Sequence, residues 1–167
     1  MSRGERYLIS IKVICVGKLK ERFFTDAETE YVKRLSGYCK LKIVEVPEHR
    51  MPDPPSNAQI VVALEKESAL IRAQIPSDTK TVALCIEGRA IDSPGLSKLL
   101  VDNAVQGSSR LCFIIGGSFG LHEDIKKQAD IRLSMSAMTF PHNLARVMLL
   151  EQLYRAFKIA EGGKYHK

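Results

Sequence analysis

A glycine-rich turn is one segment of this 167-residue chain whose residue types could do chemistry. Residues 114–121 read IIGGSFGL, an apolar run followed by closely spaced glycines. Glycines between a strand and a helix let a ligand approach the backbone and expose N–H groups to it. The spacing differs from the G-x-G-x-x-G of dinucleotide sites and lacks the Lys-Ser/Thr of P-loops, so neither ligand class is expected. A plain tight turn is the alternative to a ligand-binding turn.

A second candidate is the segment at residues 133–142, LSMSAMTFPH, which is rich in hydroxyl and thioether side chains. It lies between an expected short strand and an expected long helix. Loops at the carboxyl ends of parallel strands form the ligand sites of open α/β folds. This loop could offer backbone polar groups to a base and methionine and phenylalanine faces to its rings. The alternative is a connector whose hydroxyls cap the following helix.

The last expected helix, residues 142–161, is apolar around more of its circumference than a surface helix requires. Glu151, Arg155 and Lys158 form a charged stripe along it. Its own sheet can cover one side, and we expect a second copy of the chain to cover the other in a homodimer. Full burial within one subunit is the alternative. The tail at residues 162–167, GGKYHK, is either a frayed basic end or a flap that reaches an anionic substrate.

Alternating strands and helices must position these segments. Strands are predicted at residues 8–16, 41–47, 80–87, 110–115 and 131–135, and helices at 21–38, 57–75, 94–106, 121–129 and 142–161. Ser93 is the expected N-cap of the third helix, with Pro94 at its first position. Most strands are apolar on both faces, which predicts an α/β fold with a mostly parallel sheet and helices on both faces. The proline-rich stretch 48–56 is interpreted as an ordinary crossover loop.

Composition narrows the class of protein. The net charge of +6 weakly favours a polyanionic partner. The four cysteines form no C-x-x-C pair and are expected to be buried free thiols in a reducing compartment. The four histidines are scattered, so no metal site is expected. No apolar run approaches the ~20 residues that span a bilayer, and no signal peptide is recognisable, so we expect a soluble, cytoplasmic protein without a membrane partner.

Taken in order, these motifs resemble the RlmH family, small bacterial methyltransferases of the SPOUT class. The matching segments are residues 11–18 (IKVICVGK), 113–121 (FIIGGSFGL), 138–142 (MTFPH), 151–159 (EQLYRAFKI) and 165–166 (YH). The resemblance covers residues 11–167, which we expect to form a single SPOUT methyltransferase domain. Residues 1–10 depart from the family pattern and are treated as an N-terminal extension of unknown role.

The resemblance implies methylation by S-adenosylmethionine of N3 of a pseudouridine in 23S ribosomal RNA, by a homodimer. It also implies a C-terminal trefoil knot, which topology rules would not predict because knots are rare. The residues that match the family's cofactor-binding segments are Leu84, Gly116, Met135, Ser136, Ala137, Met138, Thr139 and Phe140. Since no separate RNA-binding module is visible, we expect recognition of the assembled ribosome.

Methylation at a ring nitrogen of this kind requires removal of its proton, and an imidazole suits that task. His142 and His166 are the candidate groups, with helix capping or a role in holding the loop as the alternative for His142. Tyr165 is expected to stack on the target base, and the tail that carries it could come from the partner subunit.

Arg146 and Arg155 are expected to contact RNA or to orient the site. A structural ion pair, for example with Glu151, is the alternative for both arginines. Two other functions compete with ribosomal RNA methylation: methylation of another RNA such as tRNA, and RNA binding by a catalytically silent dimer.

Overall fold

The protein is described here from a computed structural model, which describes residues 8–162. Tyr165 and His166 lie outside the described residues. The elements, in chain order, are β1 (Ile9–Val16), α1 (Arg22–Leu35), β2 (Cys39–Val46), α2 (Asn57–Gln74), β3 (Lys80–Ala90), α3 (Ser93–Val105), β4 (Arg110–Ile115), α4 (Glu123–Gln128), β5 (Ile131–Ser134) and α5 (His142–Ala160). The strands form one sheet in the order β2-β1-β4-β3-β5.

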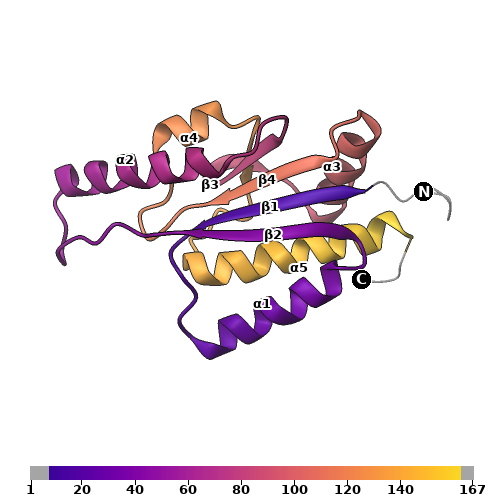
Figure 1. Cartoon of the computed structure of the whole chain (residues 1–167), viewed down its shortest axis with the longest axis horizontal. Helices are drawn as coiled ribbons and strands as arrows, with labels where there is room; N and C mark the ends of the chain where they lie inside the picture. Colours follow the sequence, from indigo (N-terminus) through magenta and orange to yellow (C-terminus); the bar gives the residue numbers. More distant parts are fainter. Residues whose placement is uncertain (1–7, 163–167) are drawn as a thin grey trace.

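The sheet is parallel at each of its strand pairings and is covered by helices on both faces (Figure 1). One core cluster joins the sheet to α1, α3 and α5, and a second joins the opposite face to α2 and α4. Figure 1 shows α2 and α4 on one side of the sheet and α1 and α5 on the other. The predicted α/β fold with helices on both faces is therefore confirmed, whereas the trefoil knot stays a prediction.

Alternation along the central strands explains both cores. In β1, Ile11 and Val13 point to the α1, α3 and α5 side, while Ile14 and Val16 point to the α2 and α4 side. Successive side chains of a strand face opposite sides, so a strand buried on both faces must be apolar throughout. The apolar runs that predicted the strands are thus a consequence of the two helical layers.

Helix ends differ from the prediction at several places, and α1 ends at Leu35 instead of residue 38. The N-cap of α3 is Asp92 and not Ser93, because the Asp92 carboxylate accepts a hydrogen bond from the Gly95 N–H at 2.7 Å. The Ser93 hydroxyl instead donates to the Gln152 side chain at 2.6 Å, which ties α3 to α5. Helix α4 spans Glu123–Gln128, shorter than expected at both ends.

Strand β3 is longer than predicted and changes its register against β5 between Leu84 and Arg89. Gly88 lies at this irregularity. A Cβ atom on Gly88 would be only 2.7 Å from the carbonyl carbon of Leu133, so the two backbones approach closely where only glycine fits. The last residues of β3 are thereby held against the end of β5, close to the loop that leads into α5.

The cysteines are free thiols; Cys15, Cys39 and Cys112 are buried and Cys85 is half-buried. Burial raises the pKa of Cys15 and Cys39 to about 12 and that of Cys112 to about 11, so these thiols stay protonated at neutral pH. Within residues 8–162 there is no cluster of metal-ligating side chains, and no helix there is long and apolar enough to cross a membrane.

Candidate functional site

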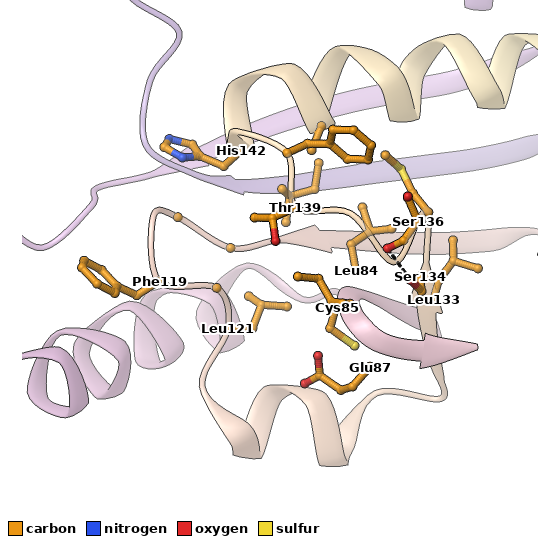
Figure 2. A pocket seen from close by; sticks show the side chains of 18 of the residues that line it. Leu84, Cys85, Glu87, Phe119, Leu121, Leu133, Ser134, Ser136, Thr139 and His142 are labelled. Atoms are coloured by element: carbon orange, nitrogen blue, oxygen red, sulfur yellow. Dashed lines mark hydrogen bonds between the residues drawn. The ribbon is translucent and has the colours of Figure 1, made fainter. Parts of the chain in front are cut away.

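A cavity of about 430 Å³ opens at the carboxyl ends of β3, β4 and β5. Three segments form it: the end of β3, the glycine-rich turn after β4, and the loop between β5 and α5 (Figure 2). Its volume lies in the range of small-molecule sites, and its place at the carboxyl edge of a parallel sheet is where open α/β folds bind ligands. Both segments that the sequence singled out therefore face one cavity.

The residues expected to hold a cofactor are brought together here from distant parts of the chain. Those that line the cavity are Leu84, Gly116, Met135, Ser136, Met138, Thr139 and Phe140. Ala137 belongs to the same loop but does not line the cavity. His142 lies at the end of the cavity opposite Ser134, with its ring directed away from the centre (Figure 2).

The glycine-rich turn is closed too tightly for a side chain at its first position. A Cβ atom on Gly116 would lie 2.3 Å from the carbonyl oxygen of Gly120, whose own φ is +78°. The Gly120 N–H donates to the Gly117 carbonyl oxygen at 3.1 Å and closes the turn. The two interpretations of this segment are thus compatible, because a tight turn also forms part of the cavity wall.

Hydroxyl groups stabilise the loop between β5 and α5 rather than the helix that follows it. The Ser134 hydroxyl donates to the Ser136 carbonyl oxygen at 3.0 Å, and the Ser136 hydroxyl accepts from the Met138 N–H at 3.0 Å. The N-cap residue of α5, Pro141, makes no side-chain capping bond. The capping interpretation of these hydroxyls is therefore wrong, since they hold the shape of the loop itself.

A charged pair that sequence patterns did not predict lies at another part of the cavity wall. Glu87 at the end of β3 pairs with Lys126 of α4, which also pairs with Glu123. The hydrogen bond from Lys126 lowers the pKa of Glu87, so the carboxylate is ionised. Its negative charge is balanced by the Lys126 ammonium. Burial, aided by the Glu87 charge, raises the pKa of the nearby Cys85 thiol. The thiol that lines the cavity is therefore kept in its neutral, weakly nucleophilic form.

Glu48 is a second group that sequence reasoning missed, because it begins the proline-rich loop interpreted as a simple crossover. One of its oxygens accepts hydrogen bonds from Ser118, at 3.2 Å from the backbone N–H and 2.8 Å from the hydroxyl. A Cβ atom on Gly17 would lie 3.5 Å from Nε2 of His142 and 3.7 Å from Oε2 of Glu48. The imidazole and the carboxylate thus lie near the same glycine. The hydrogen bonds from Ser118 to Glu48 hold the glycine-rich turn in place beside them.

Arg146 is buried, with only 3% of its surface exposed. It pairs with Glu28 of α1 and, through Nη1 at 2.8 Å, with Glu45 of β2. This arrangement corrects the expectation of RNA contact, because the guanidinium is enclosed between α1, β2 and α5. The structural alternative is the one observed, with Glu28 and Glu45 as partners in place of Glu151. Arg146 follows His142 by one helical turn and anchors the start of α5.

Arg155 pairs with Glu151, the partner named in the alternative interpretation, at 2.6 Å through Nη2. The two residues are four apart on α5, so they share one face of the helix. The Arg155 side chain retains 27% exposure, and a contact with an external ligand stays a prediction for it.

Comparison with known proteins shows which family model and which relatives are similar to this chain. A family model described as "Predicted SPOUT methyltransferase" matches residues 9–166. Ribosomal RNA large subunit methyltransferase H 1 of Clostridium perfringens (strain SM101 / Type A) is 46% identical over 159 residues, which cover 95% of this chain and 100% of that protein. Ribosomal RNA large subunit methyltransferase H of Clostridium botulinum (strain Alaska E43 / Type E3) is 47% identical with the same coverage.

The fold also resembles solved structures at much lower identity. A "probable methylase family protein" from Haemophilus influenzae Rd KW20 superposes with a TM-score of 0.55 at 12% identity, covering 95% of this chain and 71% of that one. At this identity the likeness concerns the fold alone.

Proposed function

This chain belongs to the SPOUT methyltransferase family, and from that premise we propose that it methylates large-subunit ribosomal RNA with S-adenosylmethionine as the methyl donor. The single observation that carries the proposal is the cavity at the carboxyl edge of the sheet, lined by residues of both motif segments. The relatives that share 46–47% identity over nearly the whole chain are named as methyltransferases of this RNA.

The cavity residues suit this cofactor. Apolar side chains such as Leu84, Leu121 and Phe140 can enclose an adenine ring, and the ends of three parallel strands supply backbone polar groups for its amino and hydroxyl functions. The proposed holding residues are Leu84, Gly116 and the loop 135–140, Ala137 included. When bound, S-adenosylmethionine supplies an electrophilic methyl group on a positively charged sulfur. The neutral Cys85 thiol does not compete with the substrate for that methyl group.

The proposed target is N3 of a pseudouridine in 23S ribosomal RNA, presented by the assembled ribosome. This nitrogen bears a proton that must leave before or during attack. Nε2 of His142 is the proposed acceptor within the described residues, and the Glu48 carboxylate lies near the same glycine as this nitrogen. The tail residues Tyr165 and His166 are proposed to close over the base, and Arg155 to hold RNA.

A homodimer is proposed from the rim of the cavity. Three large apolar side chains are exposed there: Ile86 by 52%, Phe119 by 45% and Met138 by 69%. Such a patch on a rim commonly marks an interaction site. Helices α1 and α3 of the same chain share a core with α5, so they cover part of the α5 surface that the sequence left for a second subunit. The rim is therefore the better candidate for the subunit contact.

The test uses labelled S-adenosylmethionine and ribosomes from cells that lack the modification. The expected result is transfer into large-subunit RNA, mapped to N3 of a pseudouridine, with naked RNA fragments methylated far more slowly. Equal rates on naked fragments would contradict ribosome recognition. Transfer into tRNA only, or cofactor binding without transfer to any RNA, would favour the competing functions and overturn the proposal.

A further inference from the structure

A second hollow, of about 350 Å³, lies at the opposite end of the sheet, where β1, β2 and β4 begin. Four cationic residues line it, Lys12, Lys40, Lys42 and Arg110, and no acidic residue does. In Figure 1 β1 begins at the right of the view, so the first residues of this strand, which line the groove, lie toward the right-hand end of the sheet. None of its residues belongs to the cavity described above.

Strand register places the cations side by side. Ile11 and Leu111 point into the core on the α1, α3 and α5 side, so their neighbours Lys12 and Arg110 point to the α2 side. Lys12 is paired in register with Lys42, and Ser10 lies between Lys40 and Arg110. Two adjacent rows of the sheet therefore carry positive charge on the same face.

Helix α2 leaves this face open because it ends at Gln74. The Lys12 ammonium donates to the Gln74 carbonyl oxygen and so has a structural partner at the negative end of the helix. Lys40, Lys42 and Arg110 are exposed and form no ion pair with any carboxylate of residues 8–162. Three of the four charges are thus available to an external partner.

Protection of an exposed sheet edge against aggregation does not account for all four cations of the groove. Lysines on an edge strand discourage sheet-to-sheet aggregation, which would account for Lys40 and Lys42 on β2. Lys12 and Arg110, however, lie on the interior strands β1 and β4. Lys12 and Lys42 are register partners on adjacent strands, so two like charges lie close together there. A polyanion in the groove would reduce the repulsion between them.

We propose that this basic groove binds the phosphate backbone of the RNA substrate at a stretch separate from the target base. The inference rests on the proposed function. Four to six residues of β1 separate the groove from the last residue of the strand, a distance of roughly 13 to 20 Å at ~3.3 Å per residue. The groove therefore contacts a different part of the RNA and contributes affinity and orientation, while the cavity performs the reaction.

The test compares two triple variants of the full chain with equal loss of charge. The groove variant carries Lys40→Ala, Lys42→Ala and Arg110→Ala, and the control carries Lys33→Ala, Lys66→Ala and Lys127→Ala, three exposed lysines on helices. Binding to ribosomes is measured over a series of salt concentrations. We expect the groove variant to bind at least tenfold more weakly, with the slope of log K against log salt reduced by about 2 to 3. The control should change less than twofold, and S-adenosylmethionine affinity should be the same in all three proteins.

Several outcomes would overturn the inference. An equal loss in both variants would mean a general charge effect, and unchanged ribosome affinity with new aggregation would leave edge protection as the only role. Groove-dependent binding to phosphatidylglycerol vesicles, with ribosome binding unaltered, would assign the groove to a membrane surface. Methyl transfer by the unmodified chain tests the proposed function separately from the groove. If the unmodified chain transfers the methyl group to RNA and the groove variant binds ribosomes normally, only the groove inference fails.

Discussion

The two ends of the sheet treat their charged groups in opposite ways. At the carboxyl end, several charged groups have partners within the chain: Glu87 pairs with Lys126, Arg146 pairs with Glu28 and Glu45, and Glu48 accepts hydrogen bonds from Ser118. At the amino end, Lys40, Lys42 and Arg110 face solvent without such partners among the described residues.

This difference separates two kinds of recognition. Internal pairing holds the loops of the cavity in one geometry before any ligand arrives, which favours chemistry that depends on position. Unpaired surface charge leaves the partner to supply the counter-charge, which favours salt-dependent binding of a polyanion. Variants at the carboxyl end test whether internal pairing holds the cavity in one geometry.

His142→Ala should slow single-turnover methyl transfer by about 100-fold, because it removes the proposed proton acceptor. The affinity for S-adenosylmethionine should be unchanged.

His122→Ala is the matched control for that change. His122 caps α4 through the Asp124 N–H and does not line the cavity, so its loss should leave the transfer rate within threefold. A similarly small change for His142→Ala would assign the proton to another group.

Arg146→Met should lower the free energy of unfolding by about 2 kcal/mol, measured by urea denaturation. Removing the guanidinium leaves the Glu28 and Glu45 carboxylates without a counter-charge. Because these two carboxylates are partly exposed, the loss of stability should be smaller than for a fully buried ion pair. Lys98→Ala, which breaks an exposed pair with Asp102, should cost less than about 1 kcal/mol. Equal losses would argue against an anchoring role for Arg146.

Gly116→Ala should weaken S-adenosylmethionine binding by about tenfold, or about 1.4 kcal/mol, as measured by calorimetry. The added methyl group collides with the Gly120 carbonyl oxygen and forces the turn to open. Gly37→Ala is the control, because a Cβ atom at that position meets nothing within 4 Å. Normal binding by Gly116→Ala would show that the turn does not hold the cofactor.

Glu67→Gln should give the smallest effect, a gain in unfolding free energy of under about 1 kcal/mol at pH 8. Burial, together with the neighbouring Glu48 charge, raises the pKa of Glu67, although the His49 N–H bond opposes this. A raised carboxyl pKa means that stability is full below the unfolded pKa and falls as pH rises through the folded pKa. The gain should therefore vanish in mildly acidic solution, and a gain that is independent of pH would contradict this account.

Local pattern in the sequence determined the elements and the segments of the site. Alternating apolar runs predicted the strands because both faces of the sheet are covered, and the motifs at 116–121 and 133–142 turned out to line one cavity. These inferences succeeded because strand burial patterns and turn chemistry depend on residues close together in the chain.

Only the tertiary structure decided which distant side chains meet. Arg146 bonds to Glu28 and Glu45, residues 118 and 101 positions away, and Glu48 bonds to Ser118 across 70 positions. The basic groove depends on the order and register of β2, β1 and β4, which no local pattern specifies. Strand order and helix packing set these contacts, because the energy that brings such groups together comes from burying the two cores and not from the residues beside them.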